Sequence, residues 1–300
     1  MASVEISQIS KSFGPVKAVD DVTFDVKSGE IFGLLGPNGA GKTTIIRLML
    51  DIFKPDAGSI SILGGPMSEA KKERIGYMPE ERGLYQDIPL ERCLVYLASL
   101  KGVKPEAARS QVGEYLDRFD LAAYRNKRVK ELSKGMQQKA QIIATLLHQP
   151  ELVIVDEPFS GLDPVNTQMI KDLLRDLNRR GVTIIMSTHQ MHQVEELCER
   201  ILLIDHGQSV LYGELDDIRR QFMGHAVMVR AVDELPQLPG VERVEAHNAS
   251  LRLTLASGTS AQDVLRYLVN QGISIEQFEI AVPTLDEIFI RVVQPEGGEE

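Results

Sequence analysis

The stretch "GPNGAGKTT", from Gly36 to Thr44, decides the fold of this chain. It fits the pattern G-x-x-x-x-G-K-[ST] and stands between an apolar run, "IFGLLG" (31–36), and a helical pattern over 42–51. A strand, a glycine-rich turn and a helix in this order are typical of a phosphate-binding loop, because the glycines let successive backbone N–H groups turn toward phosphate oxygens. The segment therefore predicts a site for the phosphates of a nucleotide.

Two side chains of this loop have specific expected roles. Lys42 would reach the β- and γ-phosphates, and the hydroxyl of Thr43 would ligate Mg²⁺. The partial positive charge at the start of the helix adds to the attraction for phosphate. The predicted phosphate-binding residues are Gly36, Pro37, Asn38, Gly39, Ala40, Gly41, Lys42, Thr43 and Thr44.

A second motif, "LVIVDEP" (152–158), indicates where the metal and the attacking water would be held. Its four apolar residues predict a buried strand that carries Asp156 to the carboxyl edge of the sheet, where open α/β sheets bind ligands. We expect Asp156 to hold Mg²⁺ and Glu157 to polarise the attacking water as general base. Taken alone, the motif fits a strand that ends in solvated acids equally well, but the phosphate loop favours the catalytic interpretation.

The order of the remaining elements predicts an α/β fold. Two segments with alternating apolar residues, 4–13 and 18–30, are expected to form antiparallel strands. A helix-rich region follows at about 90–147, and a helix over 165–180 separates the second motif from another buried strand, "VTIIMSTH". This alternation predicts a parallel core sheet with an antiparallel β-subdomain before it and a helical subdomain within it.

The character of the sequence changes toward the carboxyl end. From about residue 222, three strands, a helix, a strand and a closing helix are expected, which predicts a small α+β domain on a short hinge. We therefore divide the chain into a nucleotide-binding domain (1–220) and an accessory domain (221–293). The last residues, 294–300, are expected to be disordered.

Charge and hydropathy exclude some classes of function. The net charge is −10, and residues 221–300, with five Arg and twelve Asp or Glu, account for −7 of it. Since no basic stripe with interleaved aromatic residues occurs, no nucleic-acid partner is expected. No apolar run reaches the roughly eighteen residues of a membrane-spanning helix, and the first residues lack the apolar core of a signal peptide, so we expect a cytoplasmic chain.

The two motifs, with the segments between and after them, resemble the nucleotide-binding subunit of ATP-binding cassette (ABC) transporters over Val4–Arg220. The resemblance implies that "LSKGM" (132–136) is the signature loop, whose Ser133 and Gly135 contact the γ-phosphate of ATP held by a second subunit. Two copies, or this chain and a related ATPase subunit, would then pack head to tail around two ATP molecules.

Other family positions follow from the same resemblance. Phe13 stands where the family stacks an aromatic ring on adenine, although a lone aromatic residue fits a core position equally well. "SGLD" (160–163) corresponds to a dimer-contact loop, and His189 to the catalytic histidine that hydrogen-bonds the γ-phosphate. From spacing alone, His189, His192 and Glu195 could hold a metal, but no further ligand group converges on them.

Two departures from the family pattern bear on activity. The signature carries Lys134 and Met136 where Gly and Gln are usual, and the lysine either adds favourable charge near the phosphate or points to solvent. Glu80 stands where the family commonly has a Gln that touches Mg²⁺, with Glu81 as the alternative aligned residue. Because a carboxylate is also a hard oxygen ligand, we expect Glu80 to remain a metal ligand and to tune coupling more than binding.

The resemblance implies an ATP-hydrolysing subunit that drives export through separate integral-membrane permease subunits. These would dock at about 77–100 and hold the chain at the inner face of the membrane. The end "PTLDEIFIRV" resembles a bacterial exporter subfamily that includes sodium-extrusion and drug-efflux ATPases.

A soluble ABC ATPase acting on ribosomes or DNA is the alternative, but such members usually carry two cassettes, coiled coils or zinc-binding insertions. A non-catalytic switch would require a damaged general base. The accessory domain is either a regulatory sensor or an appendage that stabilises a dimer.

Overall fold

A computed structural model describes residues 2–81, 83–223, 226–233, 235–247, 250–256 and 258–293 of the chain. The predicted disordered tail, 294–300, lies outside the described residues. The chain divides into two compact units, Met1–Leu215 and Asp216–Glu300, which we describe one at a time.

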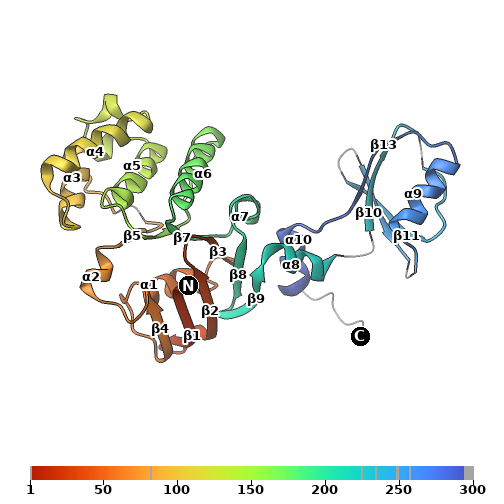
Figure 1. Ribbon diagram of the computed structural model, residues 1–300, viewed down its shortest axis with the longest axis horizontal. Helices are drawn as coiled ribbons and strands as arrows, with labels where there is room; N and C mark the ends of the chain where they lie inside the picture. Colours follow the sequence, from red (N-terminus) through yellow and green to blue (C-terminus); the bar gives the residue numbers. More distant parts are fainter. Residues whose placement is uncertain are drawn as a thin grey trace. The chain divides into compact units, whose positions relative to one another are not determined.

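The first unit begins with a three-stranded antiparallel sheet in the order β2-β1-β4 (Figure 1). Its strands are β1 (Ala2–Phe13), β2 (Val16–Lys27) and β4 (Ala57–Ile62). Along β1 and β2 the buried residues, among them Val4, Ile6 and Phe24, alternate with exposed ones. The expected alternating strands are therefore present, and their apolar face contributes to the core of this unit.

The central sheet has six strands in the order β5-β6-β7-β3-β8-β9. Its strands are β3 (Ile31–Leu35), β5 (Ile75–Met78), β6 (Leu152–Asp156), β7 (Thr183–Thr188), β8 (Arg200–Asp205) and β9 (Gln208–Glu214). The first five strands in this order are parallel, and β9 pairs antiparallel with β8. Every residue of β3, β6 and β7 is buried, which explains why these segments are apolar without alternation.

Helices surround this sheet, and three of them group in one place (Figure 1). That group consists of α3 (Leu90–Leu100), α4 (Pro105–Arg118) and α5 (Lys134–Leu146), with short 3₁₀ turns at Ala122–Tyr124 and Val129–Glu131. The others are α1 (Lys42–Met49), α2 (Glu69–Lys72), α6 (Pro164–Arg179) and α7 (Met191–Leu197). The helix-rich region expected at 90–147 is thus a distinct helical layer.

The second unit contains a four-stranded antiparallel sheet in the order β11-β12-β10-β13. Its strands are β10 (Ala226–Ala231), β11 (Val241–His247), β12 (Ser250–Leu255) and β13 (Ile275–Ile280). Helix α9 (Ala261–Asn270) packs Val264 and Leu268 against Val227, Val229 and Leu253 of the sheet. The unit therefore has its own small core, and α10 (Leu285–Val293) is its last helix.

The segment expected as a short hinge forms a helix, α8 (Leu215–Phe222). Leu215 and Ile218 are buried and stand three residues apart, so they lie on one face of the helix. Asp216, Asp217 and Arg220 are exposed on the other face, whereas Arg219, four residues after Leu215, is half-buried. The apolar spacing of this segment is that of an amphipathic helix.

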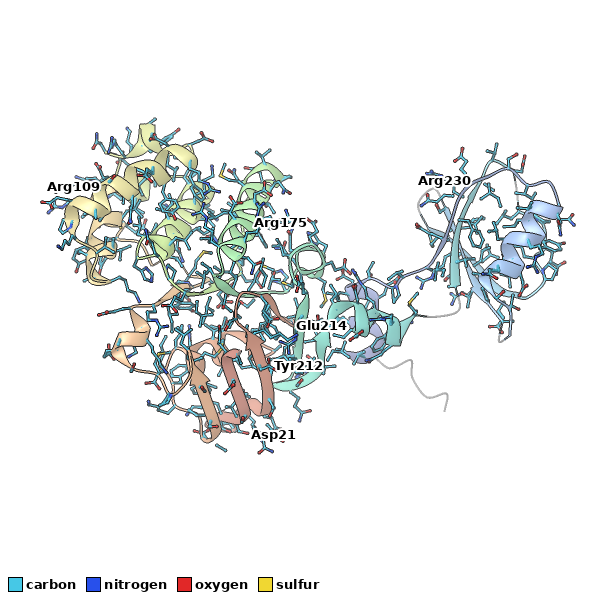
Figure 2. The ribbon with its side chains drawn as sticks, viewed as in Figure 1. Asp21, Arg109, Arg175, Tyr212, Glu214 and Arg230 are labelled. Carbon is cyan, nitrogen blue, oxygen red and sulfur yellow. The ribbon has the colours of Figure 1, made fainter. Side chains whose placement is uncertain are left out.

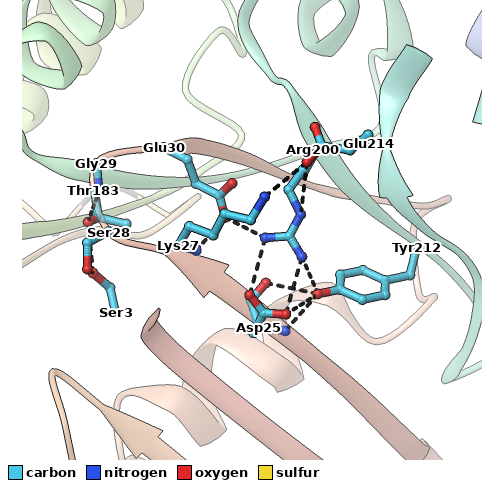
Figure 3. A network of polar contacts seen from close by, with 10 residues as sticks. All are labelled: Ser3, Asp25, Lys27, Ser28, Gly29, Glu30, Thr183, Arg200, Tyr212 and Glu214. Carbon is cyan, nitrogen blue, oxygen red and sulfur yellow. Dashed lines mark hydrogen bonds and ion pairs between the residues drawn. The ribbon is translucent and has the colours of Figure 1, made fainter. Parts of the chain in front are cut away.

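A polar network ties the antiparallel sheet to the central sheet. Arg200 begins β8, is only 6% exposed, and contacts Tyr212, which projects from β9 (Figure 2). Its guanidinium also donates to Asp25 at 3.3 Å and to Glu30 at 3.0 Å (Figure 3). Burial raises the pKa of Glu30, although the backbone N–H of Lys27 and the charge of Arg200 oppose this effect. The network fixes the strands around the site described below.

Candidate active site

A cavity of about 380 Å³ lies at the phosphate loop, at the carboxyl ends of the parallel strands. The position is the one that open α/β sheets use for ligands. Its lining residues come from five separate parts of the first unit: Val16, Lys17, Ala18, Asn38, Gly39, Gly41, Lys42, Thr43, Thr44, Glu80, Asp156, Glu157, His206 and Gly207. The structure thus brings most of the predicted site residues together around one space.

The conformation of the phosphate loop requires its glycines. Gly36 has a φ of +149°, and a Cβ added there would lie 2.1 Å from the carbonyl oxygen of Ile204. Gly41 has a φ of +111°, and its added Cβ would lie 2.5 Å from the carbonyl oxygen of Ala18. Gly39 also has a positive φ, but nothing lies within 4 Å of an added Cβ. The loop is therefore tightly packed at Gly36 and Gly41 and has free space at Gly39.

Lys42 is held in the centre of this loop. Its Nζ donates to the carbonyl oxygens of Gly36 at 2.6 Å and Pro37 at 3.0 Å. Burial lowers the pKa of Lys42, while the neighbouring carboxylates, Glu157 foremost, oppose the shift. The ammonium group lies among acidic side chains on one side and backbone carbonyls on the other, as expected for a cation poised to bind phosphate.

Asp156 and Thr43 provide a small set of oxygen ligands. The Thr43 hydroxyl donates to Asp156 Oδ2 at 3.1 Å, and the Ser187 hydroxyl donates to Oδ1. Burial raises the pKa of Asp156, and the hydrogen bonds from Ser187 and Thr43 lower it. Glu80, an exposed carboxylate, lines the same cavity. A hydroxyl with one or two carboxylates suits Mg²⁺, which takes its other ligands from water and phosphate.

Glu157 is fixed by Thr188, the last residue of β7, and by His189, which follows it. Its Oε1 accepts from the backbone N–H of His189 at 2.9 Å and lies 2.7 Å from His189 Nδ1. Its Oε2 accepts from the Thr188 hydroxyl at 3.0 Å. The residue is 5% exposed and has a φ of +49°, a left-handed conformation that is uncommon for a non-glycine residue. The strained backbone and the three contacts together fix one orientation of this carboxylate at the cavity.

The signature residues do not reach this cavity. Ser133 caps α5, and its hydroxyl accepts from the backbone N–H of Met136 at 3.3 Å. A Cβ added to Gly135 would meet nothing closer than Leu162, at 3.6 Å. Packing within the described chain thus gives no steric reason for a glycine there. Neither residue lines the nucleotide cavity of its own chain.

Phe13 and His192, like Ser133 and Gly135, do not line the cavity, and His189 contacts Glu157 without being a lining residue. The Phe13 ring packs edge-on against Phe53, with ring centroids 5.2 Å apart, and it does not line the cavity. His192 contacts Gln193, and within the described part of the chain no three His, Cys, Asp or Glu side chains are grouped to hold a metal.

Several residues of the site were missed in the sequence. Residues 16–18 and 206–207 line the cavity, and Ser187 and Thr188 hold the two carboxylates. "STH" ends the expected strand "VTIIMSTH", and only its histidine was assigned a role. For 16–18 and 206–207 no sequence signal is available, because they reach the cavity only through the packing of distant segments.

Comparison with known proteins places this site in a family. The family model described as "ABC transporter" matches residues 19–160. An uncharacterized ABC transporter ATP-binding protein of Bacillus subtilis (strain 168), YhaQ, is 42% identical over 96% of this chain and 97% of its own length. The chain belongs to the ABC transporter ATP-binding proteins. A second model, "ATP-binding protein DrrA1-3-like, C-terminal domain", matches residues 213–293 of this ABC protein.

Other relatives agree. The Nod factor export ATP-binding protein I of Rhizobium sp. (strain N33) is 33% identical over 97% of this chain and 96% of its own length. A solved structure titled "Structure of ATP binding subunit of ABC transporter" superposes with a TM-score of 0.68 at 33% identity, covering 73% of this chain and 92% of that one.

Membership of this family establishes the general activity of the chain. This ABC protein binds ATP and hydrolyses it in coupling to transport, on the ABC-type P-loop fold expected from the sequence. Among the described residues, no helix is long and apolar enough to cross a membrane. The relatives give no support to the alternative of a ribosome- or DNA-acting ATPase.

Proposed function

We propose that this chain is the ATPase of an exporter and works as a dimer, with itself or with a related ATPase subunit, that closes around two ATP molecules. One observation carries the proposal: the phosphate loop, metal ligands and general base share one cavity, whereas Ser133 and Gly135 lie outside it. A second chain can supply that missing part. The names of the relatives in Rhizobium (Nod factor export) and Bacillus subtilis (linearmycin resistance) support export as the direction.

The residues at the phosphates have separate proposed roles. The glycine loop offers backbone N–H groups, and Lys42 can leave its two carbonyl partners for phosphate oxygens. Thr43, Asp156 and Glu80 are the residues that would hold Mg²⁺. When bound, Mg²⁺ supplies positive charge that offsets the charge developing on the phosphate oxygens during hydrolysis.

Glu157 is the proposed general base. The hydrogen bonds from His189 and Thr188 hold its carboxylate in one orientation, so that it can accept a proton from the attacking water. The His189 side chain is 47% exposed and remains accessible to a ligand beside Glu157. We assign to His189 the orientation of Glu157 and a contact with the γ-phosphate.

The second half of each site would come from the partner's α5. Its N-terminus presents backbone N–H groups and the partial positive charge of a helix start. The open space around Gly135 leaves room for the close approach of another chain's nucleotide. Asp163, in the loop predicted to contact the partner, caps α6 by accepting from the backbone N–H of Asn166 at 2.9 Å.

We further propose that a separate integral-membrane permease docks on residues 77–100 and holds the chain at the inner face of the membrane. Three large apolar side chains in this range are exposed: Tyr85 (49%), Tyr96 (45%) and Leu100 (61%). The rings of Tyr85 and Tyr96 pack edge-on with centroids 5.5 Å apart, so they form one surface. No nucleic-acid partner is proposed.

Residues 221–293 are proposed as an accessory domain. Their separate core and the match of the second family model to 213–293 support this division. The boundary of the compact units, at Leu215, lies slightly before the one expected from the sequence.

The dependence of ATPase rate on protein concentration tests the dimer. If the sites are composite, the rate per chain should rise with concentration and level off when the dimer is saturated. A rate strictly proportional to concentration down to high dilution would contradict the proposal. The Lys42→Ala variant, which lacks the phosphate contact, provides the background rate.

A further inference from the structure

A cavity of about 260 Å³ in the first unit is lined by α4, by the end of α5 and by the residue that follows α6. We call it the α4–α6 cavity. It shares no lining residue with the nucleotide cavity. Two arginines and one glutamate give its lining a net positive charge, although the chain as a whole carries −10. The polar residues of this lining are Gln111, Glu114, Tyr115, Arg118, Gln149 and Arg180.

The face of α4 that lines the cavity is separate from the face that packs in the core. Residues three and four apart on a helix are neighbours, so Gln111, Tyr115 and Arg118 lie along one side of α4. The buried residues of this helix, among them Val112 and Leu116, lie along another side. The polar side chains at the cavity are therefore not required for the packing of α4.

Tyr115 and Arg118 are both held in position at this cavity. The Tyr115 ring packs against the Phe119 ring with centroids 6.4 Å apart, and Arg118 Nη2 donates to Asp176 Oδ2 of α6 at 2.8 Å. Burial raises the pKa of Tyr115, and the charges of Arg118 and Arg180 oppose this effect. Both guanidinium groups therefore lie near the phenol oxygen, in agreement with their place in the same lining.

Arg180 is the cation of this cavity that lacks a counter-ion. The preceding residue, Arg179, pairs with Asp176, whereas no carboxylate of the described residues forms an ion pair with Arg180. A single unpaired arginine on a surface is ordinary. Here, however, it shares a concave space with a second guanidinium and a phenol hydroxyl. Two like charges in one cavity repel each other, and an anion placed between them removes that repulsion.

The directions of the donors select the kind of anion. Arg118 and Tyr115 reach the cavity from α4, and Arg180 reaches it from the end of α6. A carboxylate offers two oxygens in one plane, whereas a phosphate group offers oxygens in tetrahedral directions and can accept from donors on several sides. Glu114 also lines the cavity and would repel a polyanion, so the lining suits one phosphate group better than a chain of them.

We propose that the α4–α6 cavity binds a single phosphate group, held between the guanidinium groups of Arg118 and Arg180 with the Tyr115 hydroxyl as a third donor. The bound group bridges α4 and the end of α6, and so connects the helical layer to the segment that enters β7. Because this cavity and the nucleotide cavity are lined by different residues, the inference does not depend on the proposed function.

The test is a calorimetric titration of the full chain with inorganic phosphate at constant ionic strength. The chain is first saturated with Mg²⁺ and a non-hydrolysable ATP analogue, so that phosphate cannot enter the nucleotide cavity. One phosphate should bind per chain. Phosphate should also raise the melting temperature of the loaded chain above that in chloride of equal ionic strength, because a ligand that binds only the folded chain stabilises it.

Variants of Arg180 locate the site. Arg180→Gln should weaken phosphate binding about tenfold, since it removes a charged donor. Arg180→Lys, which keeps the charge but loses the planar fork, should bind with an affinity between those of Arg180→Gln and the wild type. Arg179→Gln is the matched control, because it removes the same charge one residue away and does not line the cavity. It should leave phosphate binding unchanged.

Several results would overturn the inference. They are the absence of saturable phosphate binding to the loaded wild-type chain, equal losses in Arg180→Gln and Arg179→Gln, or a dicarboxylate such as succinate that binds as tightly as phosphate. The first and third use the wild-type chain, so they decide the question even if a variant folds poorly.

A second arm identifies the source of the phosphate group. Vesicles of phosphatidylcholine with phosphatidic acid are sedimented with the loaded chain, with and without free phosphate. Sedimentation that free phosphate and Arg180→Gln both abolish would assign the site to a lipid headgroup. No sedimentation, together with saturable binding of free phosphate, would assign it to a soluble phosphate. Sedimentation that persists in Arg180→Gln would place lipid binding elsewhere and leave the titration to decide.

Discussion

Adjacent carboxylates at the end of β6 occupy different surroundings. Asp156 accepts hydrogen bonds from two hydroxyls, whereas Glu157 accepts a backbone N–H and lies against an imidazole ring. The first arrangement suits a metal ligand and the second a base that receives a proton. The motif "LVIVDEP" predicted both residues, but Ser187 and Thr188, which also hold them, lie further along the chain and were not recognised.

Ser187→Ala should change the pH dependence of Mg²⁺-dependent ATP binding. The Ser187 hydrogen bond stabilises the ionised form of Asp156, so its loss raises further a pKa that burial already raises. In its proposed role Asp156 would hold the metal only when ionised, and binding should therefore be lost as pH falls through that pKa. The midpoint of the loss, measured with a fluorescent ATP analogue, should move to higher pH in the variant.

Thr188→Ala is the control for this measurement, because its hydroxyl contacts Glu157 instead. A midpoint that stays in place or moves to lower pH in Ser187→Ala would contradict the role given to Asp156.

Glu80→Gln tests the role of Glu80, which stands where the family commonly has Gln. Glu80 lines the cavity, and its charge raises the pKa of Lys42. Removing the charge should alter the stimulation of ATPase rate by the permease by several-fold while basal ATP binding changes less. Both quantities are measured on the complex and on the isolated chain, with Glu81→Gln as the neighbouring control. Unchanged rate and unchanged stimulation would reject the hypothesis.

At the scale of elements, the strands and helices that depend on neighbouring residues in the sequence were predicted. The alternating strands, the buried strands and the helix after the phosphate loop all follow from periodicity and turn residues. The four-residue β5 and the antiparallel β9 were not predicted, since short strands carry little periodic signal. The cavity wall at Ala18 and Gly207 depends on tertiary pairing: the Gly207 N–H donates to Ala40 O at 2.9 Å, and its carbonyl accepts from the Asp20 N–H.

Gly135→Ala, in α5, should raise the stability of the chain and lower its ATPase rate. Because an added Cβ meets nothing closer than 3.6 Å, the change should raise the free energy of unfolding. Alanine is favoured over glycine in a helix by about 0.5–1 kcal/mol. The ATPase rate should nevertheless fall, since the methyl group would obstruct the partner's nucleotide. Urea unfolding and steady-state ATPase assays on the same sample measure both effects.

Gly36→Ala is the matched contrast, because its Cβ would lie 2.1 Å from a backbone oxygen and must destabilise the chain. An ATPase rate in Gly135→Ala equal to that of the wild type would place the signature loop outside the active site.

At the scale of the whole molecule, the proposal is that one chain carries halves of two different sites. The cavity and the start of α5 belong to the same unit, yet Ser133 and Gly135 do not line the cavity. The family resemblance implied this division, and the residues alone could not, because a loop that binds a second copy has the same sequence signals as one that binds its own ligand. If the division is as proposed, activity should require two chains.

The mass of the Glu157→Gln variant under saturating ATP and Mg²⁺ tests this account most directly. The substitution removes the base and keeps the size of the side chain, so hydrolysis should fall by about 10²–10⁴-fold while ATP still bridges two chains. Light scattering should report twice the chain mass of 33.3 kDa, and only 33.3 kDa when Lys42→Ala is added. A Glu157→Gln chain that stays at the single mass with ATP and Mg²⁺ bound would contradict the composite site.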